Sequence, residues 1–290
     1  MHVHGDNAPA PACAPKHKTC KSMQLTTLEV ETRNHVGIIW FNRPDIRNAL
    51  NDVVLKEMNA TLKALEKDKS VRAIVLGGRG PAFCAGADLN WMKRAANFTK
   101  AQNAKDAGGL ATTLWTLYNL KKPTVARIHG PAYAGGTGFA AACDVAVAST
   151  EATFCLSETR LGLIPATISP YVLRAMGERA ASRYFLTAER FDAAEAYRIG
   201  FVHEIAPPEE LDSTINDILG HLVQAGPRAL DETKKLIQLV GGTKMTPAVR
   251  AETARRIAET RASAEGKEGI ASFLEKRKPK WVTDLKIDAK

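Results

Sequence analysis

Strand-like and helix-like segments alternate along the sequence before residue 205, and this alternation restricts the possible folds more than any other feature. Two segments with alternating apolar residues, Leu28–Arg33 and Val36–Phe41, are separated by two residues and predict a β-hairpin. Later strands, with helices between them, are predicted at Val71–Leu76, Thr124–Ile128 and Asp144–Ala148. Because strands joined through helices pair in parallel by crossover connections, the pattern predicts an α/β fold with a mainly parallel sheet.

Helical patterns mark out the rest of the chain. Asn51 or Asp52 is predicted to cap an amphipathic helix, and a second long helix runs from about Lys100 to Leu120. After residue 206 helices follow one another without strands, at Pro208–Gln224, Pro227–Val240, Pro247–Ala262 and Glu265–Lys276. The first 22 residues have no periodicity, and Met23 suits the start of the native chain. The sequence therefore predicts a disordered tail or tag at 1–22, an α/β core at 23–206 and a helical region at 207–290.

The composition excludes several classes of protein. No apolar run reaches the roughly 20 residues of a membrane span, so no membrane association is predicted. Five cysteines without a C-x-x-C pair argue against a disulfide framework or a zinc ribbon, and for a reducing, cytoplasmic location. The formal net charge of +9 suits a polyanionic small molecule, nucleic acid or anionic lipid. A basic face kept for solubility explains the charge equally well.

Two loops each place small residues just before a helix. The first, Gly77–Leu89, follows a predicted strand, and the second, Gly130–Gly138, follows the next one and leads into a short Ala-rich helix. Small residues at a helix start leave backbone N–H groups uncovered, and the helix dipole makes them good donors to an anion. Two converging donors would form an oxyanion hole for a thioester carbonyl that becomes an enolate. Close packing of helix on strand is the alternative explanation, because it also selects Gly and Ala.

Most other catalytic motifs are missing or out of context. Gly136–Ala141 fits the dinucleotide pattern G-x-G-x-x-A, but a loop separates it from its strand and earlier strands precede it, which argues against a dinucleotide site. The sequence holds no G-x-S-x-G elbow, no P-loop and no H-E-x-x-H zinc motif, so no metal site is predicted.

Glu158 is the acidic residue best suited to catalysis. Apolar residues surround it on both sides in the sequence, so a desolvated carboxyl group with a raised pKa is expected. Such a group suits proton transfer. A salt bridge to Arg160 or a turn-capping role remains an alternative for this side chain.

Taken together, these segments resemble the crotonase, or enoyl-CoA hydratase/isomerase, superfamily. The similarity runs from about residue 28 to 280 and rests on Phe41–Pro44, Arg47–Leu50, Ala82–Leu89, Gly130–Asp144, Leu156–Pro165 and Phe273–Lys278. It implies a spiral of ββα units with a helical C-terminal trimerisation region at 207–290, and assembly as a homotrimer or a dimer of trimers. It also implies an acyl-CoA thioester substrate bound in the core at 23–206, and no cofactor apart from the CoA of the substrate.

The resemblance assigns roles to individual residues. It implies that the N–H groups of Ala87 and Gly135 bind the thioester oxygen, and that Glu158 delivers a proton to the substrate α-carbon. Arg47 and Lys276 match basic positions near the CoA phosphates. The remaining residues implied to bind substrate or CoA are Ala85, Asp88, Leu89 and Gly136.

One position departs from the familiar hydratase pattern. The second glutamate of well-known hydratases would fall at Gly138, which has no side chain to act as a base. A single carboxylate can still serve a syn addition of water, and isomerisation of the double bond needs only one base. Hydratase and isomerase activities therefore both remain open.

Finer resemblance points to a branched dicarboxylyl-CoA substrate. The segments Asp88–Lys93, Ile168–Val172 and Arg183–Phe191 look like those of bacterial 3-methylglutaconyl-CoA hydratases, which implies a place in leucine or isoprenoid breakdown. Lys93, Arg94 and Arg160 are the candidate partners of a second substrate carboxylate. A general short-chain enoyl-CoA hydratase is the alternative.

RNA binding is the alternative from a different class of function. One hydratase of this kind resembles an RNA binder, and the helix after Asn51 carries Lys56, Lys63, Lys67 and Lys69. No aromatic stacking platform accompanies these lysines, so the pattern favours a solvated helix face over a nucleic-acid partner.

Overall fold

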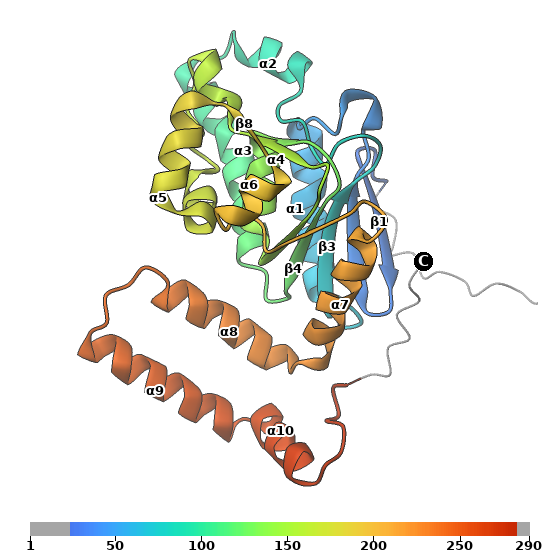
Figure 1. Ribbon diagram of the computed structural model, residues 1–290, viewed down its shortest axis with the longest axis vertical. Helices are drawn as coiled ribbons and strands as arrows, with labels where there is room; N and C mark the ends of the chain where they lie inside the picture. The colour runs from blue at the N-terminus through green and yellow to red at the C-terminus, as the bar shows by residue number, and fades with distance from the viewer. Residues whose placement is uncertain (1–23, 283–290) are drawn as a thin grey trace, which may run out of the picture.

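A six-stranded sheet forms the centre of the protein (Figure 1). The computed structural model describes residues 24–282, so the predicted tail at 1–22 lies outside the described residues. The strands, in their order across the sheet, are β1 (Leu28–Arg33), β2 (Val36–Phe41), β3 (Ala73–Gly78), β4 (Thr124–Ile128), β6 (Val145–Ser149) and β9 (Glu204–Ala206). β1 and β2 pair antiparallel, and every other neighbouring pair is parallel. The predicted α/β fold with a mainly parallel sheet is confirmed.

The predicted hairpin is present with its expected bounds. Arg33 lies opposite Val36, and the two residues between them, Asn34 and His35, have positive φ angles of 45° and 67°. Two successive left-handed residues make a type I′ turn, whose twist matches that of the two strands. The hairpin therefore closes tightly at an edge of the sheet.

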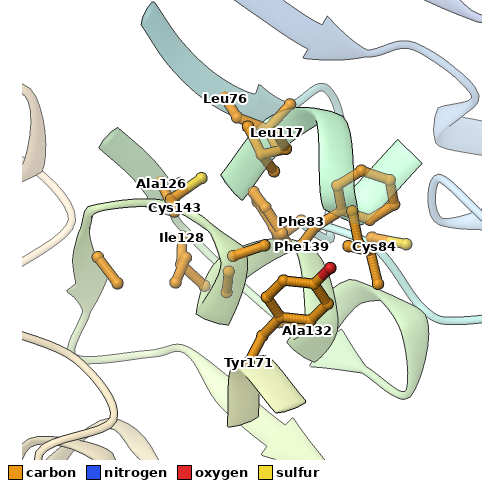
Figure 2. Close-up of a cluster of buried hydrophobic side chains, with 14 of the residues drawn as sticks. Leu76, Phe83, Cys84, Leu117, Ala126, Ile128, Ala132, Phe139, Cys143 and Tyr171 are labelled. Carbon is orange, nitrogen blue, oxygen red and sulfur yellow. The ribbon is translucent and has the colours of Figure 1, made fainter. Parts of the chain in front are cut away.

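Helices cover both faces of the sheet because the side chains of each strand alternate between the two faces. On one face, Ile74 and Leu76 of β3 join a large core cluster with residues of α1 (Asp52–Lys67), α3 (Lys100–Tyr118), α4 (Gly135–Ala142) and α5 (Ser169–Thr187). Figure 2 shows part of this cluster, to which Leu117, Phe139 and Tyr171 contribute from three of the helices. On the other face, Ala73 and Val75 pack with Leu211, Ile215 and Leu219 of α7 (Leu211–Gln224).

A small second sheet and several short elements were not predicted from the sequence. The second sheet contains β5 (Ala132–Tyr133), β7 (Thr153–Cys155) and β8 (Arg190–Asp192). The short elements are η1 (Pro44–Ile46), α2 (Leu89–Ala95), η2 (Ser157–Leu161) and α6 (Ala193–Arg198). Each has two to seven residues, too few to produce a periodic pattern.

The last three helices extend away from the core (Figure 1). They are α8 (Pro227–Val240), α9 (Pro247–Ala262) and α10 (Ala264–Leu274), and the only buried residue among them is Ser272. Large apolar side chains on this extension are exposed, namely Ile237, Ile257, Ile270, Phe273 and Leu274. The α7 helix packs on the sheet instead, so within the predicted helical region 207–290 the extension starts after α7.

Polar contacts join this extension and the residues that flank it to the core. The Arg72 guanidinium donates to the carbonyl oxygens of Ala225 and Trp281, at 2.8 and 2.9 Å. Lys234 of α8 reaches Asp144 at 2.7 Å. Within residues 24–282, no helix is both long and apolar enough to cross a lipid bilayer.

Candidate active site

Three segments that are distant in the sequence lie side by side next to the start of α4. The N–H of Tyr133 donates to the carbonyl of Cys84 at 2.9 Å, which joins the first glycine-rich loop to the second. The N–H of Ala134 donates to the carbonyl of Cys155 at 2.8 Å, which joins the second loop to β7. Because η2 follows β7 after a single residue, Glu158 lies three residues beyond Cys155, the residue that binds the second loop.

The backbone around Ala87 leaves its N–H group free. Leu50 donates to the carbonyl of Gly86 at 2.7 Å and accepts from the N–H of Asp88 at 2.8 Å, which forms a parallel bridge. In such a bridge the intervening N–H, here that of Ala87, points away from Leu50. Within the described chain this N–H donates no hydrogen bond, and Ala87 itself is exposed to solvent.

The N–H of Gly135 is free for a different reason. Gly135 is the first residue of α4, where a helix leaves its N–H groups without internal acceptors, and no side chain caps this end. Glycine is also required sterically, because a Cβ at position 135 would lie 2.7 Å from Leu50 Cδ1 and one at Gly136 would lie 2.3 Å from the Cys84 carbonyl oxygen. The two explanations of the small residues, N–H donation and close packing, therefore apply to the same positions.

Glu158 is partly buried in η2, and its Oε2 atom is buried without a hydrogen-bond partner among the described residues. Burial raises the pKa of this carboxyl group above its ordinary value, because desolvation penalises the charged form. Arg160 forms no ion pair with Glu158 in the described chain, and the Glu158 side chain caps no helix there. The two alternatives weighed for Glu158 are thus not observed.

A buried side chain closes position 138. A Cβ at Gly138 would lie 2.2 Å from Cγ2 and 2.8 Å from Cβ of Ile168, and 3.6 Å from Leu114 Cδ1. Ile168 is only 1% exposed, so it has no room to move aside freely. The sequence shows that position 138 carries no carboxylate, but only the structure identifies Ile168 as the residue that fills the space beside it.

The side chain of Asp88 is occupied by contacts within the protein. Its Oδ1 accepts from the N–H groups of Asn90 and Trp91 at the start of α2, and its Oδ2 accepts from Arg43 at 2.8 Å. Arg43 also donates to the carbonyl of Ala49. Asp88 therefore holds together α2, the first glycine-rich loop and the segment before α1.

The other residues expected to bind substrate or CoA lie in two separate places. Arg47 is exposed, and its carbonyl accepts from the N–H of Ala85 at 2.9 Å, so it borders the first loop. Leu89 begins α2 and is 73% exposed. Lys276 follows α10, which lies at the opposite end of the molecule from α2 in Figure 1. One chain alone therefore does not bring Lys276 to Arg47.

The three cations considered for a substrate carboxylate differ in their surroundings. Arg94 pairs with Asp52 at 3.1 Å on the surface. Lys93 and Arg160 are exposed and form no ion pair within residues 24–282.

The cysteines inside the described range, among them Cys84 and Cys143, are buried and free, and burial raises the pKa of both of these thiols to about 12. These two residues are packed core residues.

The chain is similar to many known proteins over most of its length. A model of the family described as Enoyl-CoA hydratase/isomerase matches residues 31–284. The short-chain-enoyl-CoA hydratase of Clostridium acetobutylicum is 32% identical over 88% of this chain and 97% of its own length. The structure of an enoyl-CoA hydratase from Shewanella pealeana is 39% identical with a TM-score of 0.87, covering 89% of this chain and 97% of that one. AtuE of Pseudomonas aeruginosa is 37% identical with a TM-score of 0.84, covering 89% and 100%.

Proposed function

This chain belongs to the enoyl-CoA hydratase/isomerase family, and we propose that it is a hydro-lyase that adds water to the double bond of an α,β-unsaturated acyl-CoA. The observation that carries this proposal is the partly buried carboxyl group of Glu158, whose Oε2 atom has no hydrogen-bond partner among the described residues, on a segment joined to the second of two loops with free backbone N–H groups. The proposed reaction needs no cofactor beyond the CoA that the substrate brings.

The first requirement of this chemistry is to stabilise negative charge on the thioester oxygen. The N–H groups of Ala87 and Gly135 are assigned to that oxygen. Hydrogen bonds from both polarise the conjugated system, make the β-carbon electrophilic and stabilise the enolate that forms when water adds. Preorganised donors of this kind are each worth about 3–4 kcal/mol of transition-state stabilisation.

The second requirement is a group that moves one proton from water to carbon. In the proposed mechanism the Glu158 carboxylate accepts a proton from water while the water oxygen bonds to the β-carbon. The resulting carboxylic acid then donates a proton to the α-carbon of the enolate and returns to its starting state. The raised pKa of Glu158 supports this role, because it brings the protonated and ionised forms closer in free energy.

The finer proposal concerns the acyl group and assembly. We propose 3-methylglutaconyl-CoA, or a related branched dicarboxylyl-CoA, as the substrate, in leucine or isoprenoid breakdown in the cytoplasm. The sequence resemblance around α2 and α5 supports this choice.

We also propose a homotrimer or a dimer of trimers, which the exposed apolar residues on the α8–α10 extension support.

Isomerisation is the second candidate activity, because the closed space at Gly138 leaves one carboxylate for the chemistry. A panel of acyl-CoA thioesters, scored separately for hydration, isomerisation and thioester hydrolysis, tests both activities. We expect hydration, with 3-methylglutaconyl-CoA preferred over crotonyl-CoA in kcat/KM by at least about 100-fold, since the uncharged substrate lacks the carboxylate that a cation of the site would bind. Equal turnover of the two would assign the enzyme to general short-chain enoyl-CoA hydration, and double-bond migration without hydration would make it an isomerase.

A further inference from the structure

A cavity of about 550 Å³ lies between α1, α2 and α3, outside the arrangement of Ala87, Gly135 and Glu158. This volume is within the range of small-molecule sites in proteins. Leu55 of α1, Trp91 of α2 and Phe98 of the following loop form its apolar part, and Gly108 and Gly109 of α3 also line it.

The two glycines are not required by the packing of this chain. They lie in the middle of a helix of 19 residues, where each costs about 1 kcal/mol relative to alanine. A Cβ at Gly108 would meet nothing within 4 Å, and one at Gly109 would make an ordinary contact of 3.7 Å with Leu55 Cδ1. Side chains would fit at both positions, so the glycines keep a space open that the chain itself does not fill.

The polar groups around the cavity mainly present hydrogen-bond donors. Lys56 and Lys105 form no ion pair or hydrogen bond within residues 24–282. The Gln102 Oε1 atom accepts from the N–H of Thr99 at 2.8 Å, so its NH₂ group remains available. The Asn59 Oδ1 atom lies 2.9 Å from the Thr116 hydroxyl, which likewise leaves the NH₂ group available.

The carboxylates at the cavity already have partners. Asp52 pairs with Arg94 at 3.1 Å, and Asp106 accepts a hydrogen bond from Trp91 Nε1 at 2.9 Å. An incoming anion would therefore meet two unpaired ammonium groups and two amide donors beside an aromatic surface. This combination suits an anionic group carried on an apolar stem.

The cavity is also close to the assigned oxyanion hole. A Cβ at Gly135 would lie 2.7 Å from Leu50 Cδ1 and 3.9 Å from Leu110 Cδ2. Leu110 directly follows the cavity residue Gly109, and Leu50 lies two residues before the cavity residue Asp52. The cavity lining is thus next in the chain to the leucines that border Gly135.

We propose that this cavity binds an organic carboxylate on an apolar stem, with Lys56 and Lys105 pairing with the carboxylate and Trp91 packing on the stem. The carboxylate has two possible sources, the far end of the acyl group of the substrate or a separate organic acid. Only the first source rests on the proposed function, because it requires an acyl-CoA in the neighbouring site.

Two experiments distinguish these sources. The first compares kcat/KM for enoyl-CoA thioesters of equal chain length that end either in a carboxylate or in a methyl group. If the substrate is the source, wild-type protein prefers the carboxylate series at least about tenfold. Lys56→Ala with Lys105→Ala, and separately Gly108→Leu, abolish that preference, whereas the matched exposed variant Lys63→Ala retains it.

The second experiment measures binding of free decanoate by calorimetry. If a separate acid is the source, decanoate binds the wild type and Lys63→Ala, and the double lysine variant and Gly108→Leu weaken its binding at least about tenfold. Because this arm needs no turnover, it tests the cavity even if every thioester proves inert, which would count against the proposed function alone. The inference is overturned if wild-type protein neither prefers the carboxylate series nor binds decanoate, or if the cavity variants behave like Lys63→Ala in both experiments.

Discussion

Replacing Gly138 by alanine should destabilise the protein, although alanine is normally the better helix former. Gly138 lies inside α4, where Gly→Ala is expected to gain about 1 kcal/mol of stability from helix propensity. Against this gain, the added Cβ would lie 2.2 Å from Ile168 Cγ2, in a fully packed core. Overpacking of that kind costs up to about 3 kcal/mol. The net expectation is a loss of up to about 2 kcal/mol, or a fall in Tm of up to about 8 °C at fixed protein concentration.

The assay is thermal and urea unfolding of the wild type and the Gly138→Ala variant, with Gly108→Ala as the matched control. Gly108 also lies within a helix, but open space surrounds its added Cβ, so that variant should be stabilised by up to about 1 kcal/mol. In an Ile168→Ala background, which removes Cγ2, the penalty of Gly138→Ala should shrink. A Gly138→Ala variant as stable as the wild type, or a penalty that is unchanged in the Ile168→Ala background, would show that no clash with Ile168 limits position 138.

The remaining predictions concern catalysis and assembly. Glu158→Gln should lower kcat by about 10²–10⁴. Because the pKa of Glu158 is raised in the folded state, ionisation of Glu158 destabilises the fold as the pH rises above the pKa of the unfolded chain. The glutamine variant should therefore be more stable than the wild type at neutral pH and lose this advantage below about pH 4. Equal unfolding midpoints of the two proteins at neutral pH would contradict the stability prediction, and turnover above a tenth of wild type would contradict the catalytic one. Gly135→Pro, which deletes the N–H, should cost about 3–4 kcal/mol of transition-state stabilisation in kcat/KM, and near-normal kinetics in a folded variant would contradict the assignment. A chain that stops after Gln224 should lose the proposed trimer, and light scattering that finds the full-length protein monomeric at micromolar concentration would contradict this prediction.

Local interactions explain why much of the fold could be predicted from the sequence. The spacing of apolar residues and a capping residue act over only a few positions. Asn51 caps α1 as one of two expected candidates, and α8 and α9 begin at Pro227 and Pro247 as expected. The β3 strand is shifted by two residues, from Val71–Leu76 to Ala73–Gly78, because the parallel ladder with β2 and β4 decides where a buried apolar run pairs.

The residues of the candidate site also differ in whether a local sequence pattern indicates them. The sequence alone indicated Glu158, because apolar residues surround it, and the two loops, because small residues stand just before a helix in each. The Arg43–Asp88 pair joins positions 45 residues apart, and Ile168 meets Gly138 across two helices, so neither has a local signal. The cavity beside Gly108 likewise exists only because α1, α2 and α3 leave a space between them. Which side chain fills or opens a space depends on contacts between distant segments, and only the tertiary structure decides these.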